Sequence, residues 1–234
     1  MKDLNLQFIA DLSLPVADIP RAWYIDAPTF EPVQLGDWTG SVAAGNGVNF
    51  FNIGFNPHAH GTHTETAGHI LLERHSVHHH FKDFFTKAIL LTVTPKNGVV
   101  GNSDFLEAWK KLDPTDIQSV IIRTEPKSED RRIRNYSNTD WPYLESSIGA
   151  FLRDQGVNHL LIDQPSVDKE EDGGALACHH AFWGPTPDRS LHRTISELLH
   201  IPDRVEDGTY LLNLQVAPLE NDAAPSRPIL YRWS

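Results

Sequence analysis

The sequence predicts an α/β fold, in which buried strands alternate with helices. Short apolar runs at 88–93, 120–122 and 157–162 are typical of strands that are buried on both faces. Segments 103–112 and 141–156 lie between these runs and carry apolar side chains at helical spacing. We therefore expect buried strands that are connected by helices.

The N-terminal part is expected to contain two strands with a loop-rich segment between them. Residues 4–14 alternate and then become apolar, and residues 48–55 are rich in aromatic and β-branched side chains. The second strand would deliver a histidine-rich segment at its end. Trp23, Tyr24 and Phe30 lie in the proline-containing loop between the strands. They either pack beneath a long loop or form a wall of an aromatic substrate pocket.

Two helices are expected in the middle of the chain. Ser103 or Asp104 is suited to cap the first helix. The second is expected to start at Trp141 and to stop at Gly156, because glycine favours the left-handed conformation that ends many helices.

The strand at 120–122 ends at Arg123, which either contacts a substrate or forms a structural ion pair. Residues 127–134 are highly charged and are expected to form a loop. Two more strands are expected near the C-terminus, at 209–216 and 229–231.

Composition narrows the classes of function. The 234 residues have no internal repeat and are expected to form one large domain, 1–234. The formal net charge of −11 argues against nucleic acid and anionic membranes as partners, since both need a basic surface.

Cys178 is the single cysteine, which excludes an intrachain disulfide and fits a reducing compartment. No apolar run suits a signal peptide or a membrane span, so we expect a cytoplasmic enzyme.

The strongest functional signal is a histidine cluster at 56–69. Eight of the 13 histidines lie between His58 and His80. Imidazole and carboxylate groups are ordinary ligands of zinc and similar divalent ions. His63 and Glu65 are two residues apart, so in an extended chain their side chains point the same way. The segment therefore predicts a metal site, with these candidate groups: His58, His60, His63, Glu65 and His69.

A histidine-rich segment can also be a solvated surface loop that binds metal only by accident. We favour that interpretation for His75 and for the run His78-His79-His80. The ordered mixture of histidine, glycine, threonine and carboxylate at 56–69 favours a metal site instead. His69 stands four residues beyond Glu65 and is expected beside the ligands rather than among them.

The segment Gly61-Thr62-His63-Thr64-Glu65, followed by His69, resembles the signature of the cyclase family of metal-dependent hydrolases, His-x-Gly-Thr-His-x-Asp-x-Pro-x-His. That family includes kynurenine formamidase and isatin hydrolase. The chain departs from the signature at three positions: Ala59 replaces the first histidine, Glu65 replaces the aspartate, and Ala67 replaces the proline. His58 or His60 must then replace the missing ligand, and the longer arm of Glu65 would reach the same ion.

A second part of the resemblance follows the strand at 157–162. Residues 163–168 resemble the family's Asp-x-x-Ser-x-Asp segment, and a histidine ligand is expected shortly after it. His179 aligns better than His180, because an apolar stretch then follows it. The neighbouring Cys178 is expected to be a small buried residue rather than a ligand or nucleophile.

The resemblance implies a third segment and a fold. The family has a glutamate ligand in a short helix, for which Glu197 is the candidate here. Asn221-Asp222-Ala223-Ala224-Pro225 resembles the family's C-terminal segment. The implied fold is a swivelling β/β/α domain of the cyclase and kynurenine formamidase type.

The resemblance also implies ligand roles. One Zn²⁺ or Mn²⁺ ion would use His58 (or His60), His63 and Glu65. A second ion, if present, would share Glu65 and take His179 and Glu197. His69 would act as general acid and base.

The implied reaction is cleavage of a carbon–nitrogen amide bond by a metal-bound water, as in an arylformamidase. The substrate would be a small aromatic amide such as N-formylkynurenine, or a cyclic amide such as isatin. Two alternatives stay open: a relative that acts on a lactone or in cyclisation and dehydration, and a metal-binding protein without turnover. The family's members are usually homodimers or homotetramers, so the same is expected here.

Overall fold

The structure is a computed structural model that describes residues 5–126 and 129–233. The α-helices are α1 (Val77–His80), α2 (Asn102–Lys110), α3 (Ser146–Asp154) and α4 (Ala177–Trp183), and the 3₁₀ helices are η1 (Val42–Ala44), η2 (Ala67–Ile70), η3 (Glu129–Ile133) and η4 (Pro187–Arg189). The strands are β1 (Leu6–Asp11), β2 (Thr29–Pro32), β3 (Gln34–Leu35), β4 (Trp38–Thr39), β5 (Phe51–Gly54), β6 (His63–Thr66), β7 (Phe85–Val93), β8 (Val99–Val100), β9 (Ser119–Thr124), β10 (Tyr143–Leu144), β11 (His159–Ile162), β12 (Thr194–Glu197), β13 (Gly208–Val216) and β14 (Ala223–Trp233).

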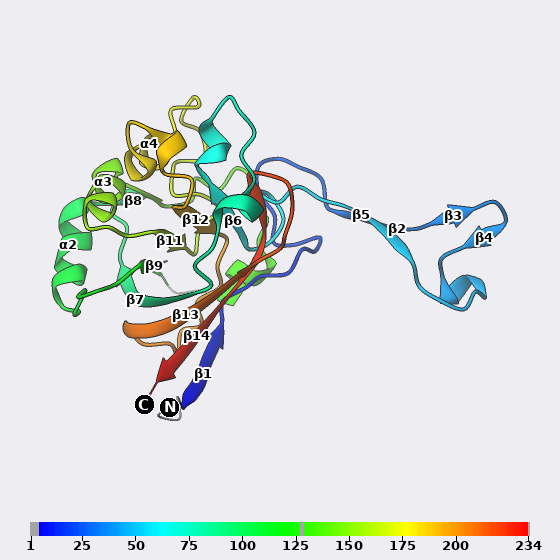
Figure 1. Cartoon of the computed structure of the whole chain (residues 1–234), viewed down its shortest axis with the longest axis horizontal. Helices are drawn as coiled ribbons and strands as arrows, with labels where there is room; N and C mark the ends of the chain where they lie inside the picture. Colours follow the sequence, from blue (N-terminus) through cyan, green and yellow to red (C-terminus); the bar gives the residue numbers. More distant parts are fainter. Residues whose placement is uncertain (1–4, 127–128, 234) are drawn as a thin grey trace.

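The main sheet is mixed, and it closes on itself. Its strand order is β1-β14-β13-β7-β9-β11-β12-β6, and β14 also pairs with β6. Strands β7, β9, β11 and β12 are parallel neighbours, whereas β6, β13 and β14 pair antiparallel. β1 pairs with β14 outside the closed ring, so both described ends of the chain lie at the same end of the molecule (Figure 1). Closure makes β6 a neighbour of the C-terminal strand.

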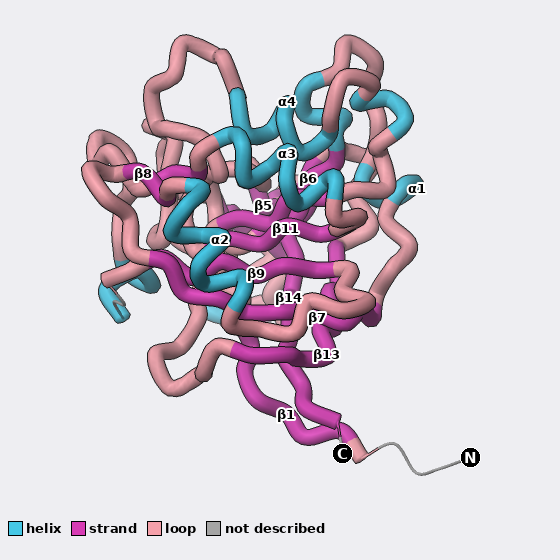
Figure 2. The backbone as a smooth tube through the Cα atoms, turned by 90° about the vertical axis from the view of Figure 1, so that its left-hand side faces the viewer, coloured by secondary structure: helices cyan, strands magenta, loops and turns pink. Residues whose placement is uncertain are grey.

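Successive residues of the central strands enter two separate apolar cores, because side chains alternate across a sheet. In β7, Ala88 and Leu90 enter the core on one face, and Ile89 and Leu91 enter the core on the other. Helices α2, α3 and α4 cover the second face, and Figure 2 shows α2 in front of β9. The strands are therefore buried on both faces, which explains why their sequences are continuously apolar.

The α/β prediction is confirmed, and so are most of the expected strands. The runs at 88–93, 120–122 and 157–162 correspond to β7, β9 and β11. The early strand is β1, and the two C-terminal strands are β13 and β14. No described helix has the length and apolar character that a membrane span requires.

The start of the first predicted helix differs from expectation. Gly101 is the N-cap of α2, so the prediction that Ser103 or Asp104 caps this helix is wrong. The carboxylate of Glu145 instead accepts a hydrogen bond from the backbone N–H of Asn102 at 2.9 Å. A side chain distant in sequence thus satisfies a helix terminus that lacks a local cap.

The second helix begins later than predicted. Tyr143–Leu144 forms β10, which pairs with β8, so α3 starts at Ser146 and not at Trp141. Trp141 is buried and donates from Nε1 to the carbonyl of Asp168 at 3.1 Å. The other end is as expected, because Gly156 follows the helix with a φ of 77°.

Strands β2 to β5 form an arm that projects from the rest of the chain (Figure 1). The predicted strand at 48–55 is shortened to β5, and every residue of β5 is exposed. Phe30 lies on the paired strand β2 and is exposed as well, so it packs beneath no loop. The histidine segment follows β5 as expected, but β5 belongs to this exposed arm and not to the main sheet.

Arg123 has a structural role. Its guanidinium pairs with Asp207 at 3.0 Å and donates to the carbonyl of Val205 at 2.7 Å. In the charged segment, residues 127–128 lie outside the described part, and Glu129–Ile133 forms η3 instead of a loop. Arg131 is buried there and forms an ion pair with Asp163.

The first prediction concerns His159, a buried side chain on β11 whose Nδ1 lies 2.8 Å from the hydroxyl of Thr194. Burial lowers the pKa of His159 to about 4. The unfolded chain therefore binds a proton more readily than the folded chain when the pH falls below about 6.5. His159 should thus cost about 2–3 kcal/mol of unfolding free energy between pH 7 and pH 4.5.

Urea unfolding of the metal-free wild-type protein and of His159→Gln at both pH values measures this cost. The variant should lose less stability on acidification than the wild type by that amount. His78→Gln removes an exposed histidine and should behave as the wild type does. Equal acid sensitivity of all three proteins would contradict the prediction.

Candidate metal centre

The candidate site is built on β6 and β12, which are antiparallel neighbours in the closed sheet. His63 and Glu65 are two residues apart on β6 and are both fully buried. Glu197 lies directly opposite His63 in the register, and its Oε2 is 3.4 Å from Nε2 of His63. The helix expected around Glu197 is wrong, since this residue ends strand β12. Pairing of β12 with β11 on one side and with β6 on the other holds this strand extended.

His58 and His60 point to different surroundings. Nδ1 of His58 lies 3.1 Å from Oε2 of Glu65, and the His58 and His63 rings are 5.4 Å apart. His60 is turned away from this cluster: its Nδ1 accepts from the backbone N–H of Asn56 at 3.0 Å. Its Nε2 donates to the carbonyl of Asp26 at 2.8 Å. Since both nitrogens of His60 are engaged, the geometry favours His58 as the candidate ligand.

His179 enters the cluster from helix α4. Its Nε2 lies 3.0 Å from Oε1 of Glu65 and 3.7 Å from Oε1 of Glu197. Its Nδ1 donates to Oδ2 of Asp168 at 2.6 Å, a contact that orients the ring. His180, by contrast, is exposed. Cys178 is buried as predicted, and burial raises the pKa of its thiol.

His69 lies beside the cluster, in the 3₁₀ helix η2 that follows β6. Its Nδ1 is 3.8 Å from Oε2 of Glu65 and 3.2 Å from Oδ2 of Asp222. The His69 and His58 rings are 4.4 Å apart. Its side chain is partly exposed, unlike those of His63 and Glu65, so His69 is the histidine of the cluster that a substrate reaches most readily.

The cluster is an ion-pair network. Burial opposes charge on His58, but hydrogen bonds to Asp222 and Glu65 outweigh it and raise the pKa of His58 to about 10. Burial likewise opposes charge on His179, whereas hydrogen bonds to Asp168 and Glu65 raise its pKa to about 10. Burial favours the neutral form of Glu65, but the nearby histidines hold the pKa of this carboxyl well below its usual range. A buried carboxylate thus depends on positive charge around it.

The donor atoms of the cluster fit a divalent metal. Nε2 of His63 and Oε2 of Glu65 are buried; among the described residues each has an ion-pair neighbour but no hydrogen bond of good geometry. Ligand atoms of His58, His63 and Glu65 lie within 4.8 Å of one another, and the same holds for Glu65, His69 and His179. Imidazole nitrogen and carboxylate oxygen suit Zn²⁺ or Mn²⁺, so the residues present are compatible with either ion.

The cluster opens into a cavity of about 270 Å³. Trp23, Ile25 and Leu176 supply an apolar wall, so one of the two interpretations of Trp23 is supported. The ring of Trp23 packs edge-on against Trp141, with centroids 4.9 Å apart. The other lining residues are Asn56, His58, Glu65, His69, Ser166, His179 and Glu197.

Two carboxylates of the site did not emerge as candidates from the sequence. In the sequence, Asp168 is only the last residue of the segment that resembles Asp-x-x-Ser-x-Asp. In the structure, its carboxylate orients the ring of His179. Asp222 was noted only within the C-terminal segment, yet it contacts His58 and His69. Asp222 lies 164 residues from His58, and the pairing of β14 with β6 brings the two together. Local spacing holds no signal for such a contact.

Comparisons with known proteins agree with this geometry. Kynurenine formamidase from Bacillus cytotoxicus is 30% identical over 115 residues, which is 49% of this chain and 49% of that protein. The enzyme of the same name from Bacillus mycoides is 33% identical over 90 residues, 38% of this chain and 39% of its own length. The matches thus span about half the length of these relatives, or less.

Two solved structures share the fold over nearly the whole chain. Isatin hydrolase A from Labrenzia aggregata superposes with a TM-score of 0.68 at 11% identity, covering 98% of this chain and 94% of that one. A predicted metal-dependent hydrolase from Bacillus stearothermophilus gives 0.65 at 18% identity, covering 97% and 98%. The family model named Cyclase matches residues 10–169, which is more than half of the sequence. This chain therefore belongs to the cyclase family.

Proposed function

We propose that this chain is a metal-dependent hydrolase that cleaves a carbon–nitrogen amide bond in a small aromatic substrate. The observation that carries this proposal is the buried His-Glu cluster, whose imidazole and carboxylate donor atoms converge beside a cavity with an aromatic wall. The names of similar proteins, kynurenine formamidase and isatin hydrolase, support the same reaction class. Zn²⁺ or Mn²⁺, when bound, would acidify a coordinated water and polarise the scissile carbonyl.

The buried side chains would hold one or two ions. His58, His63 and Glu65 form the first proposed ligand set. His179 and Glu197 complete the second set, in which Glu65 is shared, because one Glu65 oxygen faces His58 and the other faces His179. The backbone N–H of Val167 donates to Oε1 of Glu197 at 2.8 Å and fixes that carboxylate.

His69 would move the proton. Its contact with Asp222 engages Nδ1, and Nε2 is then the nitrogen left to accept or deliver a proton. In amide cleavage the leaving nitrogen must be protonated, and a histidine beside the cavity is suited to do this. His69 would therefore act as general acid and base.

The cavity indicates the size of the substrate. A volume of about 270 Å³ is at the lower end for small-molecule sites and suits a substrate with a single ring system. The Trp23 ring and the side chains of Ile25 and Leu176 would pack against that ring system. N-formylkynurenine and isatin both meet this description. The homo-oligomeric state and the cytoplasmic location stay predictions.

The second prediction concerns metal dependence. Chelator-treated protein should not hydrolyse N-formylkynurenine or isatin, and addition of Zn²⁺ or Mn²⁺ should restore turnover of at least one of them. Product formation followed by absorbance, with bound metal measured in parallel, checks this. Turnover without any metal would contradict the proposal. Tight metal binding without turnover would favour a lactone or dehydration substrate. If those substrates are not converted either, the result would favour a protein that only binds metal.

The third prediction separates a ligand from the proton-transfer group. His63→Ala should abolish both metal retention and activity, because a buried donor is removed. His69→Ala should retain metal and lose about 10²- to 10⁴-fold in kcat. Metal content by elemental analysis and steady-state kinetics distinguish the two variants, with His78→Ala as an exposed control. Full activity of His69→Ala would show that its proposed role is wrong.

The fourth prediction concerns the choice between His58 and His60. His58→Ala should weaken metal binding strongly, since its Nδ1 faces Glu65. His60→Gln should keep the metal, because both ring nitrogens of His60 bond to the backbone, at Asn56 and at Asp26. Metal titrations of both variants, with thermal unfolding as a check on the fold, test the choice. If His58→Ala binds metal as the wild type does and His60→Gln does not, the assignment of the ligand would be reversed.

A further inference from the structure

One oxygen of Asp222 serves two histidines of the site. Oδ2 of Asp222 lies 2.9 Å from Nε2 of His58 and 3.2 Å from Nδ1 of His69. The two rings are 4.4 Å apart and tilted by 35°. Because an ionised carboxylate only accepts hydrogen bonds, both of these imidazole nitrogens must carry a proton.

The backbone of Asp222 is fixed to the strand that carries Glu65. The carbonyl of Asp222 accepts from the backbone N–H of Thr66 at 3.0 Å. The next residue, Ala223, pairs with Glu65 in the β14–β6 ladder. On the other side, the carbonyl of Asn221 accepts from the N–H of Val77 at 2.8 Å. The Asp222 carboxylate is therefore held in a set position relative to Glu65.

His58, His63 and His179 each have one nitrogen near an oxygen acceptor and the other near the cluster's carboxylates. His179 places Nδ1 on Asp168, and His63 places Nδ1 3.2 Å from the carbonyl of Gly61. For His58 that acceptor is Asp222, which leaves Nδ1 facing Glu65. Such contacts select the tautomer of a metal-binding histidine. Asp222 differs from the other acceptors because it also binds His69.

We propose that Asp222 is a positioning residue that sets the tautomers of His58 and His69 together. Its contact with Nε2 of His58 leaves Nδ1 as the metal donor, and its contact with Nδ1 of His69 leaves Nε2 for proton transfer. The roles of the two histidines rest on the proposed function, whereas the assignment of the tautomers follows from the contacts of Asp222. One carboxylate thus couples metal affinity to proton transfer.

His58 has a particular need for this partner. It stands one position before the family's first histidine, where this chain has Ala59, which is fully buried. The ring therefore approaches Glu65 from a shifted backbone position, and the described residues of its own segment make no contact with its Nε2. Asp222, from the opposite end of the chain, supplies that contact.

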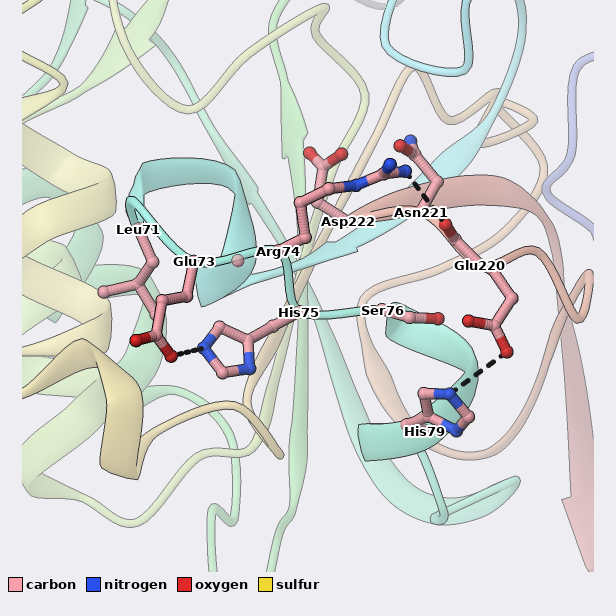
Figure 3. A pocket seen from close by; sticks show the side chains of 10 residues that line it. Leu71, Glu73, Arg74, His75, Ser76, His79, Glu220, Asn221 and Asp222 are labelled. Atoms are coloured by element: carbon pink, nitrogen blue, oxygen red, sulfur yellow. Dashed lines mark hydrogen bonds and ion pairs between the residues drawn. The ribbon is translucent and has the colours of Figure 1, made fainter.

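A second, outer pocket of about 550 Å³ lies on the other side of Asp222. Figure 3 shows Asp222 there with Arg74, Glu220 and Asn221, and an ion pair of 3.1 Å joins His79 to Glu220. Glu220 lies two residues before Asp222 and contacts neither His58 nor His69 in the described structure. Glu220→Gln is therefore a matched control for a change of charge in the same loop.

The test uses Asp222→Asn, which keeps the shape of the side chain but can donate as well as accept hydrogen bonds. Zn²⁺ titration by calorimetry should show unchanged stoichiometry and about 10- to 100-fold weaker binding, whereas Glu220→Gln should match the wild type. In ¹⁵N-histidine-labelled protein, NMR should report protonated Nε2 for His58 and protonated Nδ1 for His69 in the zinc-bound wild type. Asp222→Asn should lose this preference.

The outcomes separate the alternatives. Loss of one bound ion in Asp222→Asn would show that Asp222 is itself a ligand and would overturn the positioning role. Wild-type affinity and tautomers in the variant would overturn it as well. If the wild type binds zinc but cleaves no substrate, the proposed function fails, and the affinity and tautomer measurements still decide the role of Asp222. At saturating zinc, a reduced kcat of Asp222→Asn with unchanged KM would support the contact with His69.

Discussion

The buried carboxylate of Glu65 is the group on which the rest of the site depends. It is fully inaccessible, and a buried negative charge is costly unless positive charge surrounds it. His58 and His179 approach its two oxygens from different parts of the chain, and His69 lies nearby. The same requirement that holds these imidazoles together in the fold makes the site suited to a divalent cation. The ion pairs of the cluster and its suitability for a metal are thus two consequences of one buried charge.

Closure of the sheet is what creates this environment. Strand β6 lies between β12 and β14, so its side chains meet residues from distant parts of the sequence. β12 brings Glu197 opposite His63, and the turn before β14 brings Asp222 to His58. A site at the junction of three strands is complete only when the ring is closed. Changes that weaken the pairing of β6 are therefore expected to affect fold and site together.

In the proposed ligand set, the departures from the family signature compensate one another. Ala59 stands where the signature has its first histidine, and His58, one residue earlier, reaches the cluster instead. Glu65 is one methylene longer than the aspartate of the signature, so its carboxylate extends further from β6. Its two oxygens meet His58 and His179 at 3.1 and 3.0 Å. The shifted histidine and the longer acid are best understood as a pair.

The sequence by itself determined the α/β class, most of the core strands and the chemistry of the ligands. Continuous apolar runs predict strands buried on both faces, and alternation predicts that His63 and Glu65 share a face, because both follow from local periodicity. The tertiary structure placed the His58 ring, and not the His60 ring, in the cluster, brought Asp168 and Asp222 to it, and placed Glu197 on a strand. Each of these depends on a hydrogen bond between residues distant in sequence or on the direction of one side chain. Local pattern carries neither kind of information, since the partner across the sheet exists only after the chain has folded.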